Sequence, residues 1–340
     1  MTRNVLFITR TLGTGFGGMQ TQASALTEGL YQHPDVHLRV LAYGGGRLLL
    51  PLFFLRALFV ALFIRSGTVH LGDAVLTPLL PIIRIFRPSL RRTVTVHGLD
   101  VVWNMWAYRK VIRFSLRYAQ KIAAVSQATA DACIALGLNP ETVIVIPCGV
   151  VIPDAPLLPK PSSPVLLSFG RLVPRKGVVW FLEDVFPLLL QRYPIMRLVI
   201  AGDGPELLRI RSLVAAQKLH HSVDVLGSIP DRAKEALFSS ASMLVMPNIP
   251  VFGDMEGFGI TALEAASRGI PVVAANLEGL KDSVLDGVTG FRFLPLDLQS
   301  ACVAIEKVLT KDWDTNEMRH AVREKFDIGT IASRYVHDVF

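Results

Sequence analysis

Short runs of apolar and β-branched residues alternate with longer segments of helical periodicity along the whole chain of 340 residues. The runs show little alternation of apolar and polar positions, which is typical of strands buried on both faces of a parallel sheet. They lie at 4–10, 37–43, 68–72, 92–98, 121–126 and 143–150 in the first half, and at 165–171, 197–204, 223–228, 242–247, 270–275 and 289–295 in the second. This order of strands and helices predicts an α/β protein whose parallel sheets are covered by helices.

A proline-rich segment, PDAPLLPKPSSP at 153–164, separates the two sets of strands and is typical of a linker. A chain of this length is expected to form two domains. We therefore predict an N-terminal Rossmann-like domain over 1–155 and a C-terminal one over 156–323, each with a doubly wound sheet. In such sheets ligands bind beyond the carboxyl ends of the strands, so the two domains would face each other across a cleft.

The composition is that of a globular protein, with 51% hydrophobic and 19% charged residues. The three cysteines, Cys133, Cys148 and Cys302, show no metal-ligand spacing, and we expect reduced thiols in a cytoplasmic protein. The chain begins with a strand pattern rather than with the charged and then apolar layout of a signal peptide.

The positive charge of the chain is concentrated in its first half. Residues 1–155 contain 15 Lys and Arg against 7 Asp and Glu, and the segment 47–121 alone contains 12 basic and 2 acidic residues. Such asymmetry predicts an anionic partner for the first domain: nucleic acid, acidic lipid or an acidic acceptor.

One apolar stretch, Leu48–Ile64, approaches the length of a membrane span. Pro51 and Arg56 interrupt it, and strand patterns stand on either side. We therefore expect a buried or partly lipid-facing helix of the first domain rather than a membrane span.

A glycine-rich turn follows the first predicted strand, with Gly13, Gly15, Gly17 and Gly18 before a helical pattern. Glycines let the backbone approach a phosphate or a sugar, and the N-terminus of the following helix has free N–H groups. The glycine spacing differs from the dinucleotide fingerprint, and the second strand ends in VLAYGGG without a carboxylate for a ribose. A nicotinamide cofactor is therefore not expected.

Polar side chains follow predicted strands in both halves. His97 stands at the end of the strand at 92–98, where side chains face the cleft in this class of fold. In the second half, Gly170 ends a strand, and Arg171 and Lys176 follow before the next helical pattern. Two cations on one loop are suited to stabilise a departing nucleoside diphosphate. The alternatives are a histidine bonded to backbone and two solvated surface cations.

The block EGFGITALE contains two glutamates, Glu256 and Glu264, and predicts a helix from about residue 258 to residue 269. If the block is largely helical, the two glutamates are about 12 Å apart, which is comparable to the distance from a donor sugar to the ribose across a diphosphate. Glu256 is a candidate to accept hydrogen bonds from sugar hydroxyls, and Glu264 from ribose hydroxyls. The N–H groups around Gly259, Ile260 and Thr261 are candidates to bind the distal phosphate.

The motifs GFGGMQ, VHGLD, FGRLVPRKG, AGDGP and EGFGITALE, in this order, resemble family 4 of the retaining glycosyltransferases with a GT-B fold. The resemblance covers nearly the whole chain, and the family includes mannosyltransferases that act on phosphatidylinositol. It implies that a last helix, at about 324–340, crosses back onto the first domain. It also implies transfer of a hexose from a nucleoside diphosphate sugar with retention of the anomer, without a covalent enzyme nucleophile, an essential metal or a cofactor.

The resemblance also implies a role for each candidate residue. His97 would contact the transferred sugar, Arg171 and Lys176 would bind the diphosphate, and Glu256 would complete this catalytic group at the sugar. The donor would be bound by Gly17, Gly18, Gly170, Gly227, Ile229, Gly257, Phe258, Gly259, Ile260, Thr261 and Glu264. The loop from Gly227 to Ile229 would hold the base, largely through its backbone.

The chain departs from the family pattern in one loop. Where many members have Gly-Gly-x-Pro-Glu, this chain reads LEGLKDSV, so that Glu278 replaces a glycine and Asp282 replaces the glutamate. No role is carried over to Asp282. The sequence DWD, with Asp312 and Asp314, has the form of a metal-binding Asp-x-Asp motif, but it lies in a polar stretch beyond the nucleotide motifs. We do not expect a metal site there.

The segment WNMWAYRKVIRFSLRYAQK places Arg109, Arg113, Arg117 and Lys121 four residues apart, behind a group of aromatic residues. On a helix these cations would form a basic stripe, which is typical either of an interfacial helix on anionic lipid or of a solvated face. Together with the charge imbalance, the stripe favours peripheral association with the inner face of a membrane. The acceptor would then be a lipid, a lipid-linked sugar or a polysaccharide.

Other functions are compatible with parts of the sequence. A nucleotide-sugar epimerase or a phosphorylase could use the same fold, although a phosphorylase would need a pyridoxal lysine and no lysine has a suitable context. A non-catalytic nucleic-acid binder could use the basic half, but it leaves the two glutamates unexplained, and no nucleic-acid-binding motif is present. For a transferase, the donor is expected to be GDP-mannose or a UDP-hexose.

Overall fold

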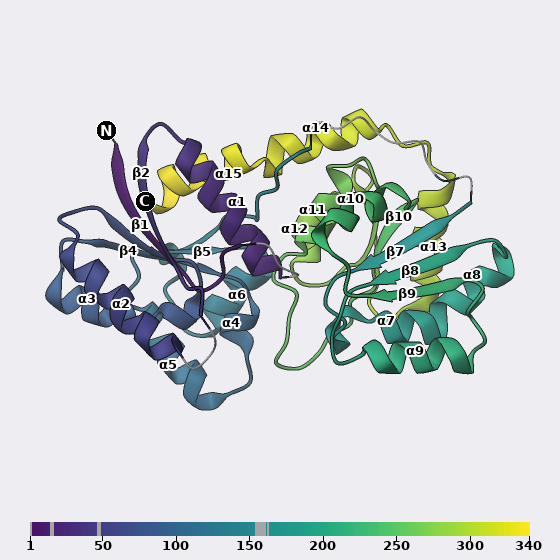
Figure 1. Cartoon of the computed structure of the whole chain (residues 1–340), viewed down its shortest axis with the longest axis horizontal. Helices are drawn as coiled ribbons and strands as arrows, with labels where there is room; N and C mark the ends of the chain where they lie inside the picture. The colour runs from purple at the N-terminus through teal and green to yellow at the C-terminus, as the bar shows by residue number, and fades with distance from the viewer. Residues whose placement is uncertain (1, 14–16, 46–48, 154–160, 162) are drawn as a thin grey trace.

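The computed structural model describes residues 2–13, 17–45, 49–153, 161 and 163–340. The chain forms two α/β domains, each with a six-stranded parallel sheet, and they lie side by side in Figure 1. This is the two-domain architecture of the GT-B fold. The strands predicted from the apolar runs are all present, six in each sheet. Most of the predicted linker lies outside the described residues.

The first sheet has the strand order β2-β1-β3-β4-β5-β6. Its strands are β1 (Arg3–Thr9), β2 (Val36–Ala42), β3 (Thr68–Leu71), β4 (Arg91–Val96), β5 (Lys121–Ala124) and β6 (Val143–Val145). The chain starts at β1, adds β2 on one side and continues with β3 on the other, so the direction of the crossovers reverses between β1 and β3. Such a reversal leaves a crevice at the carboxyl edge of a parallel sheet, where ligands bind.

Helices cover both faces of the first sheet because successive residues of β1 point to opposite sides. Leu6 and Ile8 belong to one apolar core, and Val5 and Phe7 belong to the other. The helices on the side of Leu6 are α2 (Leu50–Phe63), α3 (Leu79–Phe86), α4 (Leu99–Val102), α5 (Trp106–Leu116) and α6 (Gln127–Ala135). The side of Val5 is covered by α1 (Gly18–Gln32) and by the C-terminal segment.

The second sheet has the strand order β12-β11-β10-β7-β8-β9, so its crossovers reverse between β7 and β10. Its strands are β7 (Val165–Phe169), β8 (Arg197–Ala201), β9 (Val223–Gly227), β10 (Met243–Met246), β11 (Val272–Ala275) and β12 (Gly290–Phe293). The helices are α7 (Val178–Trp180), which continues through η5 (Phe181–Val185) into α8 (Phe186–Arg192), then α9 (Leu207–Ala216), α10 (Asp231–Ser239), α11 (Ile260–Ala266), α12 (Leu280–Ser283) and α13 (Leu298–Thr310).

The C-terminal segment returns to the first domain through α14 (Thr315–Phe326), α15 (Ile328–Arg334) and the last turn η6 (Tyr335–Val339). Figure 1 shows it running in yellow from the second domain back above the first. Here α15 contacts α1, and Tyr335 lies in the same core as Val5. The Tyr335 hydroxyl is 2.8 Å from that of Thr95, which also contacts Nε2 of the buried His70 at 3.0 Å. These contacts hold the end of the chain against the first sheet.

The apolar stretch at 48–64 forms α2, with Leu48 itself outside the described residues. Its buried residues are Phe53, Ala57 and Ala61, which make a narrow line of one aromatic and two small side chains. The expected helix of the first domain is present and its outer side is exposed, while contact with lipid stays a prediction. Within the described parts of the chain, no helix combines the length and the apolar character that a membrane span requires.

Candidate active site

The carboxyl edges of the two sheets line a cleft with a cavity of about 570 Å³. The first domain contributes residues that follow β1, that begin α1 and that lie between β4 and α5. The second domain contributes residues that follow β7, that begin α10 and that lead into α11. The two crossover reversals therefore face one cavity, which is the position expected for a ligand in sheets of this kind.

The structure brings nearly all the candidate residues into this cavity. Those that line it are Gly17, Gly18, His97, Gly170, Arg171, Lys176, Ile229, Glu256, Gly257, Phe258, Gly259, Ile260, Thr261 and Glu264. Gly227 does not line it. This residue ends β9, and its carbonyl accepts the N–H of Gly202. Gly15 lies outside the described residues. The roles predicted for these residues in donor binding remain predictions.

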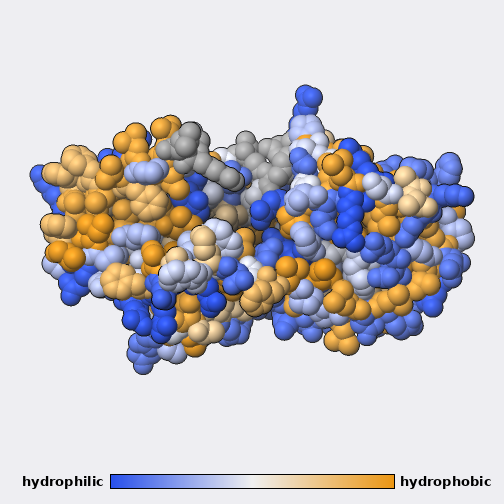
Figure 2. All heavy atoms as spheres, turned by 90° about the horizontal axis from the view of Figure 1, so that it is seen from below, coloured by the Kyte–Doolittle hydropathy of each residue, from blue (hydrophilic) through white to orange (hydrophobic). Residues whose placement is uncertain are grey.

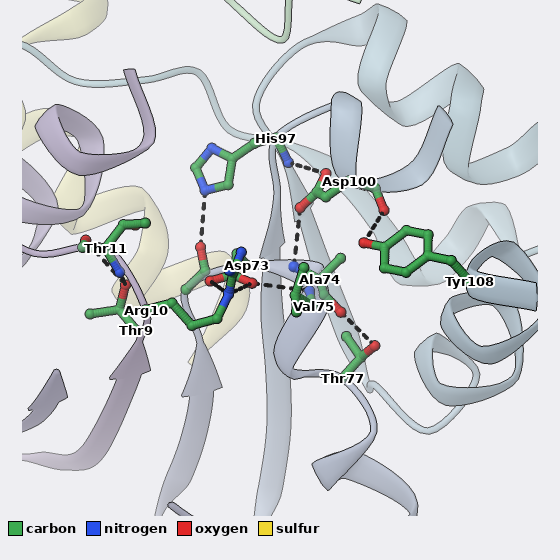
Figure 3. Close-up of polar contacts among 11 residues, drawn as sticks. Thr9, Arg10, Thr11, Asp73, Ala74, Val75, Thr77, His97, Asp100 and Tyr108 are labelled. Atoms are coloured by element: carbon green, nitrogen blue, oxygen red, sulfur yellow. Dashed lines mark hydrogen bonds and ion pairs between the residues drawn. The ribbon is translucent and has the colours of Figure 1, made fainter. Parts of the chain in front are cut away.

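His97 is held at the end of β4 by two hydrogen bonds that Figure 3 shows. Its ring Nε2 is 2.9 Å from the carbonyl of Gly72, and its backbone N–H donates to Asp100 at 2.9 Å. A carbonyl can only accept, so Nε2 carries the proton and Nδ1 is the nitrogen left for a substrate. The ring is thus both bonded to backbone and part of the cleft wall, which combines the two alternatives considered for it.

Asp100 connects two loops at this edge of the sheet. One carboxylate oxygen accepts the N–H of His97 and the other accepts the N–H of Ala74 at 3.1 Å. Burial raises the pKa of Asp100, while His97 and the two backbone hydrogen bonds oppose that rise. The Tyr108 hydroxyl donates to the Asp100 carbonyl at 2.9 Å. No motif identified Asp100 or Tyr108 as a cleft residue, although the motif VHGLD contains the aspartate.

Arg10 is a further cleft residue that the sequence did not reveal. It follows β1, and its Nε donates to both carboxylate oxygens of Asp73 at 2.9 and 3.2 Å. The Asp73 side chain is 1% exposed and also accepts the N–H of Val75. Figure 3 shows Arg10, Asp73 and His97 together at the carboxyl ends of the strands. The position of Arg10 directly after a strand could have identified it as a cleft residue.

Glu256 forms the centre of the charged cluster in the second domain. Its Oε2 is 2.6 Å from Lys176 Nζ and 3.0 Å from Arg175 Nη1, and it accepts the Asn248 amide N–H at 3.0 Å. Burial alone would raise the pKa of Glu256, but Lys176 and Arg175 outweigh burial and lower it to about 2. Arg175 also pairs with Asp254 at 3.1 Å. Glu256 is therefore ionised at neutral pH and has cations on two sides.

Lys176 reaches this position because of a tight turn at 174–176. Gly177 ends the turn with φ of 65°, and a Cβ there would lie 1.9 Å from the Pro247 carbonyl, so glycine is required. Burial lowers the pKa of Lys176, and Glu256 opposes that effect. Arg171 is exposed on the same side of the cleft, and no ion pair of its side chain occurs within the described residues. The loop thus presents two paired cations, Arg175 and Lys176, and one solvated cation, Arg171.

Glu264 lies on α11 and is paired with a lysine that the sequence did not suggest. Lys234 Nζ is 2.5 Å from Glu264 Oε1 and lies 5.5 Å from the centre of the Phe169 ring. Lys234 and Phe169 both line the cavity. The helix predicted over about 258–269 is shorter than expected, because α11 covers Ile260–Ala266. It starts after Gly259, which has a left-handed backbone with φ of 83°, and residues 267–269 form a turn. The spacing of 1.5 Å per residue therefore applies to only part of the block.

The backbones of the two domains touch next to Glu256. A Cβ on Gly257 would lie 2.1 Å from the His97 carbonyl, so only glycine allows the loop that carries Glu256 to approach the loop that carries His97. Asp282 adds a second contact, because its Oδ2 accepts the N–H of Gln127 in the first domain at 2.8 Å. Asp282 thus joins the domains, an arrangement that sequence alone could not show.

Glu278 occupies the position where the family often has glycine, and its backbone has φ of 47°. Its Oε2 accepts the N–H of Glu256 at 2.5 Å. Burial raises the pKa of Glu278, the hydrogen bond from the Glu256 N–H opposes that rise, and the charge of the Glu256 carboxylate adds to it. A non-glycine residue in this conformation is strained, and here its side chain holds the backbone of a cleft residue.

The DWD motif serves as a helix cap. Asp314 accepts the N–H groups of Asn316 and Glu317 at the start of α14. Across the described residues, no group of three His, Cys, Asp or Glu side chains is placed to hold a metal ion.

The predicted basic stripe is correct for three of its four residues. Arg109 and Arg113 lie on α5, Arg117 caps its end, and all three are exposed. Lys121 is wrong as a helical position, because it begins β5 and donates to the Glu141 carbonyl. The helix ends at Leu116, so the four-residue spacing continues past the helix into the next strand.

Two family models match consecutive parts of the chain. Residues 154–326 match Glycosyl transferases group 1, and residues 16–152 match Glycosyltransferase Family 4.

The GDP-mannose-dependent alpha-(1-6)-phosphatidylinositol monomannoside mannosyltransferase of Mycolicibacterium smegmatis is 31% identical over 259 residues, which are 71% of this chain and 67% of that protein. The GPI3 subunit of phosphatidylinositol N-acetylglucosaminyltransferase from Saccharomyces cerevisiae is 25% identical over 268 residues. That match covers 73% of this chain but 57% of the yeast protein, so the chain matches little more than half of it.

Solved structures with the same architecture cover almost the whole chain. The Anabaena protein HepE in complex with UDP has a TM-score of 0.75 at 19% identity, over 99% of this chain and 98% of that one. The catalytic domain of starch synthase IV from Arabidopsis thaliana, bound to ADP and acarbose, has a TM-score of 0.77 at 15% identity, over 99% and 98%. These likenesses show a shared fold. With the two family models, they establish that the chain belongs to the GT-B glycosyltransferases of the group 1 and family 4 type.

Proposed function

We propose that this protein is a retaining glycosyltransferase that moves a hexose from a nucleoside diphosphate sugar to a hydroxyl of a lipid, a lipid-linked sugar or a polysaccharide. The observation that carries the proposal is the cluster at Glu256. An ionised carboxylate lies 2.6 Å from the Lys176 ammonium in a cavity that Arg171, Glu264 and His97 also line. This cavity offers cations to a diphosphate and carboxylates to hydroxyl groups.

In the proposed mechanism, Arg171 and Lys176 stabilise the charge that develops on the leaving nucleoside diphosphate. Lys176 is already fixed by Glu256, so its ammonium needs little reorganisation when the diphosphate binds. Glu256 is ionised at neutral pH and therefore accepts hydrogen bonds from sugar hydroxyls instead of acting as a general acid. It also places negative charge near the anomeric carbon, where positive charge develops.

The remaining donor contacts would come from Glu264 and from the first domain. Glu264 would accept the ribose hydroxyls, with Lys234 holding its carboxylate in place. His97 faces the same cavity and would contact the transferred sugar, its ring oriented by the carbonyl of Gly72. Gly17 and Gly18, at the start of α1, would let the backbone approach the donor.

The donor is proposed to be GDP-mannose or a UDP-hexose. The Mycolicibacterium relative is named as GDP-mannose-dependent, and the Anabaena protein was solved with UDP. We propose that neither a metal ion nor an organic cofactor is required, because Arg171 and Lys176 place positive charge where the diphosphate would lie. Full activity after treatment with a chelator is the expected result.

We also propose that the protein works at the cytoplasmic face of a membrane. The exposed guanidinium groups of Arg109, Arg113 and Arg117 support this, since cations near a surface are attracted to anionic headgroups. The relatives named as acting on phosphatidylinositol-based acceptors support a lipid acceptor.

A thermal-shift panel tests the proposal first. UDP, GDP, ADP and their sugar conjugates are added separately, and the nucleotide that binds raises the melting temperature by mass action. The corresponding labelled sugar is then followed with and without candidate acceptors. Transfer that requires an acceptor supports the proposal. Absence of stabilisation by every nucleotide, or conversion of the donor into an epimer without an acceptor, contradicts it.

A further inference from the structure

Helices α2 and α3 carry a band of exposed apolar side chains that the proposed catalytic site does not use. On α2, Leu52, Leu55, Phe59 and Phe63 are each more than half exposed, at 63%, 65%, 63% and 71%. Their spacing of three and four residues places them on one side of the helix. The rings of Phe59 and Phe63 contact each other with centroids 4.5 Å apart, so the side chains form a surface rather than isolated points.

The band continues onto neighbouring helices. Ile85 and Phe86 at the end of α3 are 72% and 65% exposed. In the fold, α3 contacts both α2 and α5. Figure 2 shows apolar side chains gathered on the first domain, on the left of the view, where the underside of Figure 1 carries α2, α3 and α5. We call the six residues Leu52, Leu55, Phe59, Phe63, Ile85 and Phe86 the α2–α3 face.

The charges around the α2–α3 face have one sign. Arg56, Arg65 and Arg84 are exposed on or beside the two helices. Between residues 49 and 121 the acidic residues are Asp73 and Asp100, and both are buried. The face is therefore bordered by guanidinium groups and, in this described segment, by no exposed carboxylate. A second copy of the chain would bring these cations against one another, whereas anionic headgroups would neutralise them.

We propose that the α2–α3 face inserts into the interfacial region of an anionic phospholipid bilayer, with α2 lying along the surface. A helix of this length is about 21 Å long, and its exposed apolar side would enter the boundary between headgroups and acyl chains. The bordering arginines would then lie at the level of the phosphates. The start of α5 extends this surface, because α5 contacts α3 and its Trp106 is 72% exposed. Lys110 Nζ lies 4.7 Å from the centre of the Trp106 ring.

This docking has a consequence for the acceptor, which rests on the proposed function. Trp103 lines the cleft and is 48% exposed, and α5 begins three residues later with Trp106. The first-domain side of the cleft therefore opens next to the docked surface. A lipid that remains in the bilayer can present its headgroup to His97 there, so the acceptor is a membrane lipid rather than a soluble polysaccharide.

The test uses the full chain and flotation with vesicles made of equal parts phosphatidylglycerol and phosphatidylcholine, compared with pure phosphatidylcholine. The test variant is Leu55→Glu/Phe59→Glu, and the matched control is Leu208→Glu, a 74% exposed leucine on α9 of the second domain. A cooperative thermal unfolding transition like that of wild type checks that each variant is folded. We expect wild type and Leu208→Glu to float with the anionic vesicles. The double variant should bind these vesicles at least about tenfold more weakly than wild type.

Salt separates this surface from the α5 cations. The variant Arg109→Ala/Arg113→Ala should lose binding mainly at low ionic strength, while the double variant on α2 should lose binding at high ionic strength as well. The proposal is overturned if wild type does not float with the anionic vesicles. It is also overturned if Leu208→Glu loses as much vesicle binding as the double variant on α2. A wild-type dimer without vesicles that Leu55→Glu/Phe59→Glu converts to a monomer also overturns it, since the occupant would then be a second copy.

The proposed function can fail independently. If wild type floats through the α2–α3 face but transfers no sugar, the glycosyltransferase proposal fails and the docking stands. If sugar is transferred to a soluble acceptor at the same rate by wild type and the double variant, and neither binds vesicles, the docking fails and the transferase stands.

Discussion

The two sides of the cleft hold their polar side chains in different ways. On the first-domain side, His97 and Asp100 are bonded to backbone groups at the sheet edge, and Asp73, which pairs with Arg10, also accepts a backbone N–H. On the second-domain side, Glu256 pairs with Lys176, and Glu264 pairs with Lys234. A bond to the backbone ties a side chain to a fixed part of the fold, whereas a charged side chain held by an ion pair can also bind a charged ligand. The difference indicates a rigid first-domain side, which we propose holds the acceptor, and a second-domain side, which we propose holds the donor and whose charges are available to a charged substrate.

The comparison predicts its largest effect at Lys176. Replacement of Lys176 by alanine removes the cation proposed to stabilise the leaving group and leaves Glu256 with Arg175 and the Asn248 amide. We expect kcat to fall about 10²- to 10³-fold, a typical loss for one preorganised electrostatic contact. Steady-state kinetics with the donor identified by thermal shift measure this. Lys281→Ala, an exposed lysine of the same domain, is the matched control. Unchanged kcat in Lys176→Ala would show that the cation does not act on the leaving group.

Acidification should weaken the two domains at different pH values. Burial lowers the pKa of His70 in the first domain to about 3, with a smaller contribution from His97. The unfolded chain binds this proton near pH 6.5, so stability is fully present above that pH and is lost as the pH falls toward 3. Glu256 in the second domain has a pKa lowered to about 2, so its contribution is lost only between about pH 4.5 and 2.

The first domain should therefore lose stability earlier, by about 1.4 kcal/mol per pH unit from this one histidine. Amide hydrogen exchange at about pH 7 and about pH 5 is the measurement, since it resolves the two domains. His70→Gln, which does not titrate, should flatten the dependence in the first domain. If the amides of the second domain lose protection at a higher pH than those of the first, the assignment of this pH dependence to His70 is contradicted.

Much of this arrangement was predictable. The strands followed from apolar runs, and the positions of His97, Lys176 and Glu256 followed from their place after strands. Arg175 was not identified because the sequence PRKG does not say which of its cations faces inward. The turn at 174–176, fixed by the left-handed Gly177, decides that. Lys234 depends on how α10 packs near α11, a contact between segments far apart in the chain.

The error at Lys121 has a similar cause. Basic residues recur every four positions through RYAQK, and neither glycine nor proline marks the end of α5. Periodicity alone therefore extends the helix past its last turn. The link between Asp282 and Gln127 could not be predicted either, because it depends on the relative positions of the two domains.

The rigid character of the acceptor side can be tested at Asp100. Its two oxygens accept different backbone N–H groups, and asparagine can replace only one of them as an acceptor. In Asp100→Asn the amide group would face the other N–H, which leaves a buried donor unpaired. We expect the free energy of unfolding to fall by about 1–3 kcal/mol. Chemical denaturation measures it, with the exposed Asp312→Asn as control. An unchanged free energy would mean that these bonds do not fix the loop.

The exchangeable character of the donor side can be tested at Glu264. Glutamine in its place keeps the shape but loses the charge that strengthens bonds to ribose hydroxyls. We expect about tenfold weaker nucleotide binding, measured by calorimetry, with little change in stability. Glu324→Gln, at an exposed position of α14, is the control. Equal nucleotide affinity in Glu264→Gln and wild type would refute the ribose assignment.

The smallest effect, and the one that separates positioning from binding, is expected at Glu278. Its backbone is strained at φ of 47°, and its carboxylate holds the N–H of Glu256. Glycine at this position removes about 1 kcal/mol of strain and also removes that hydrogen bond. We therefore expect Glu278→Gly to keep its free energy of unfolding and its nucleotide affinity, while kcat falls a few-fold because the Glu256 backbone is less well fixed. Glu278→Gln, which can still accept the N–H, should recover most of kcat.

If Glu278→Gly loses nucleotide affinity instead, Glu278 contributes to donor binding. The donor side would then combine exchangeable charges with a fixed loop, and the contrast between the two sides would be weaker than drawn above.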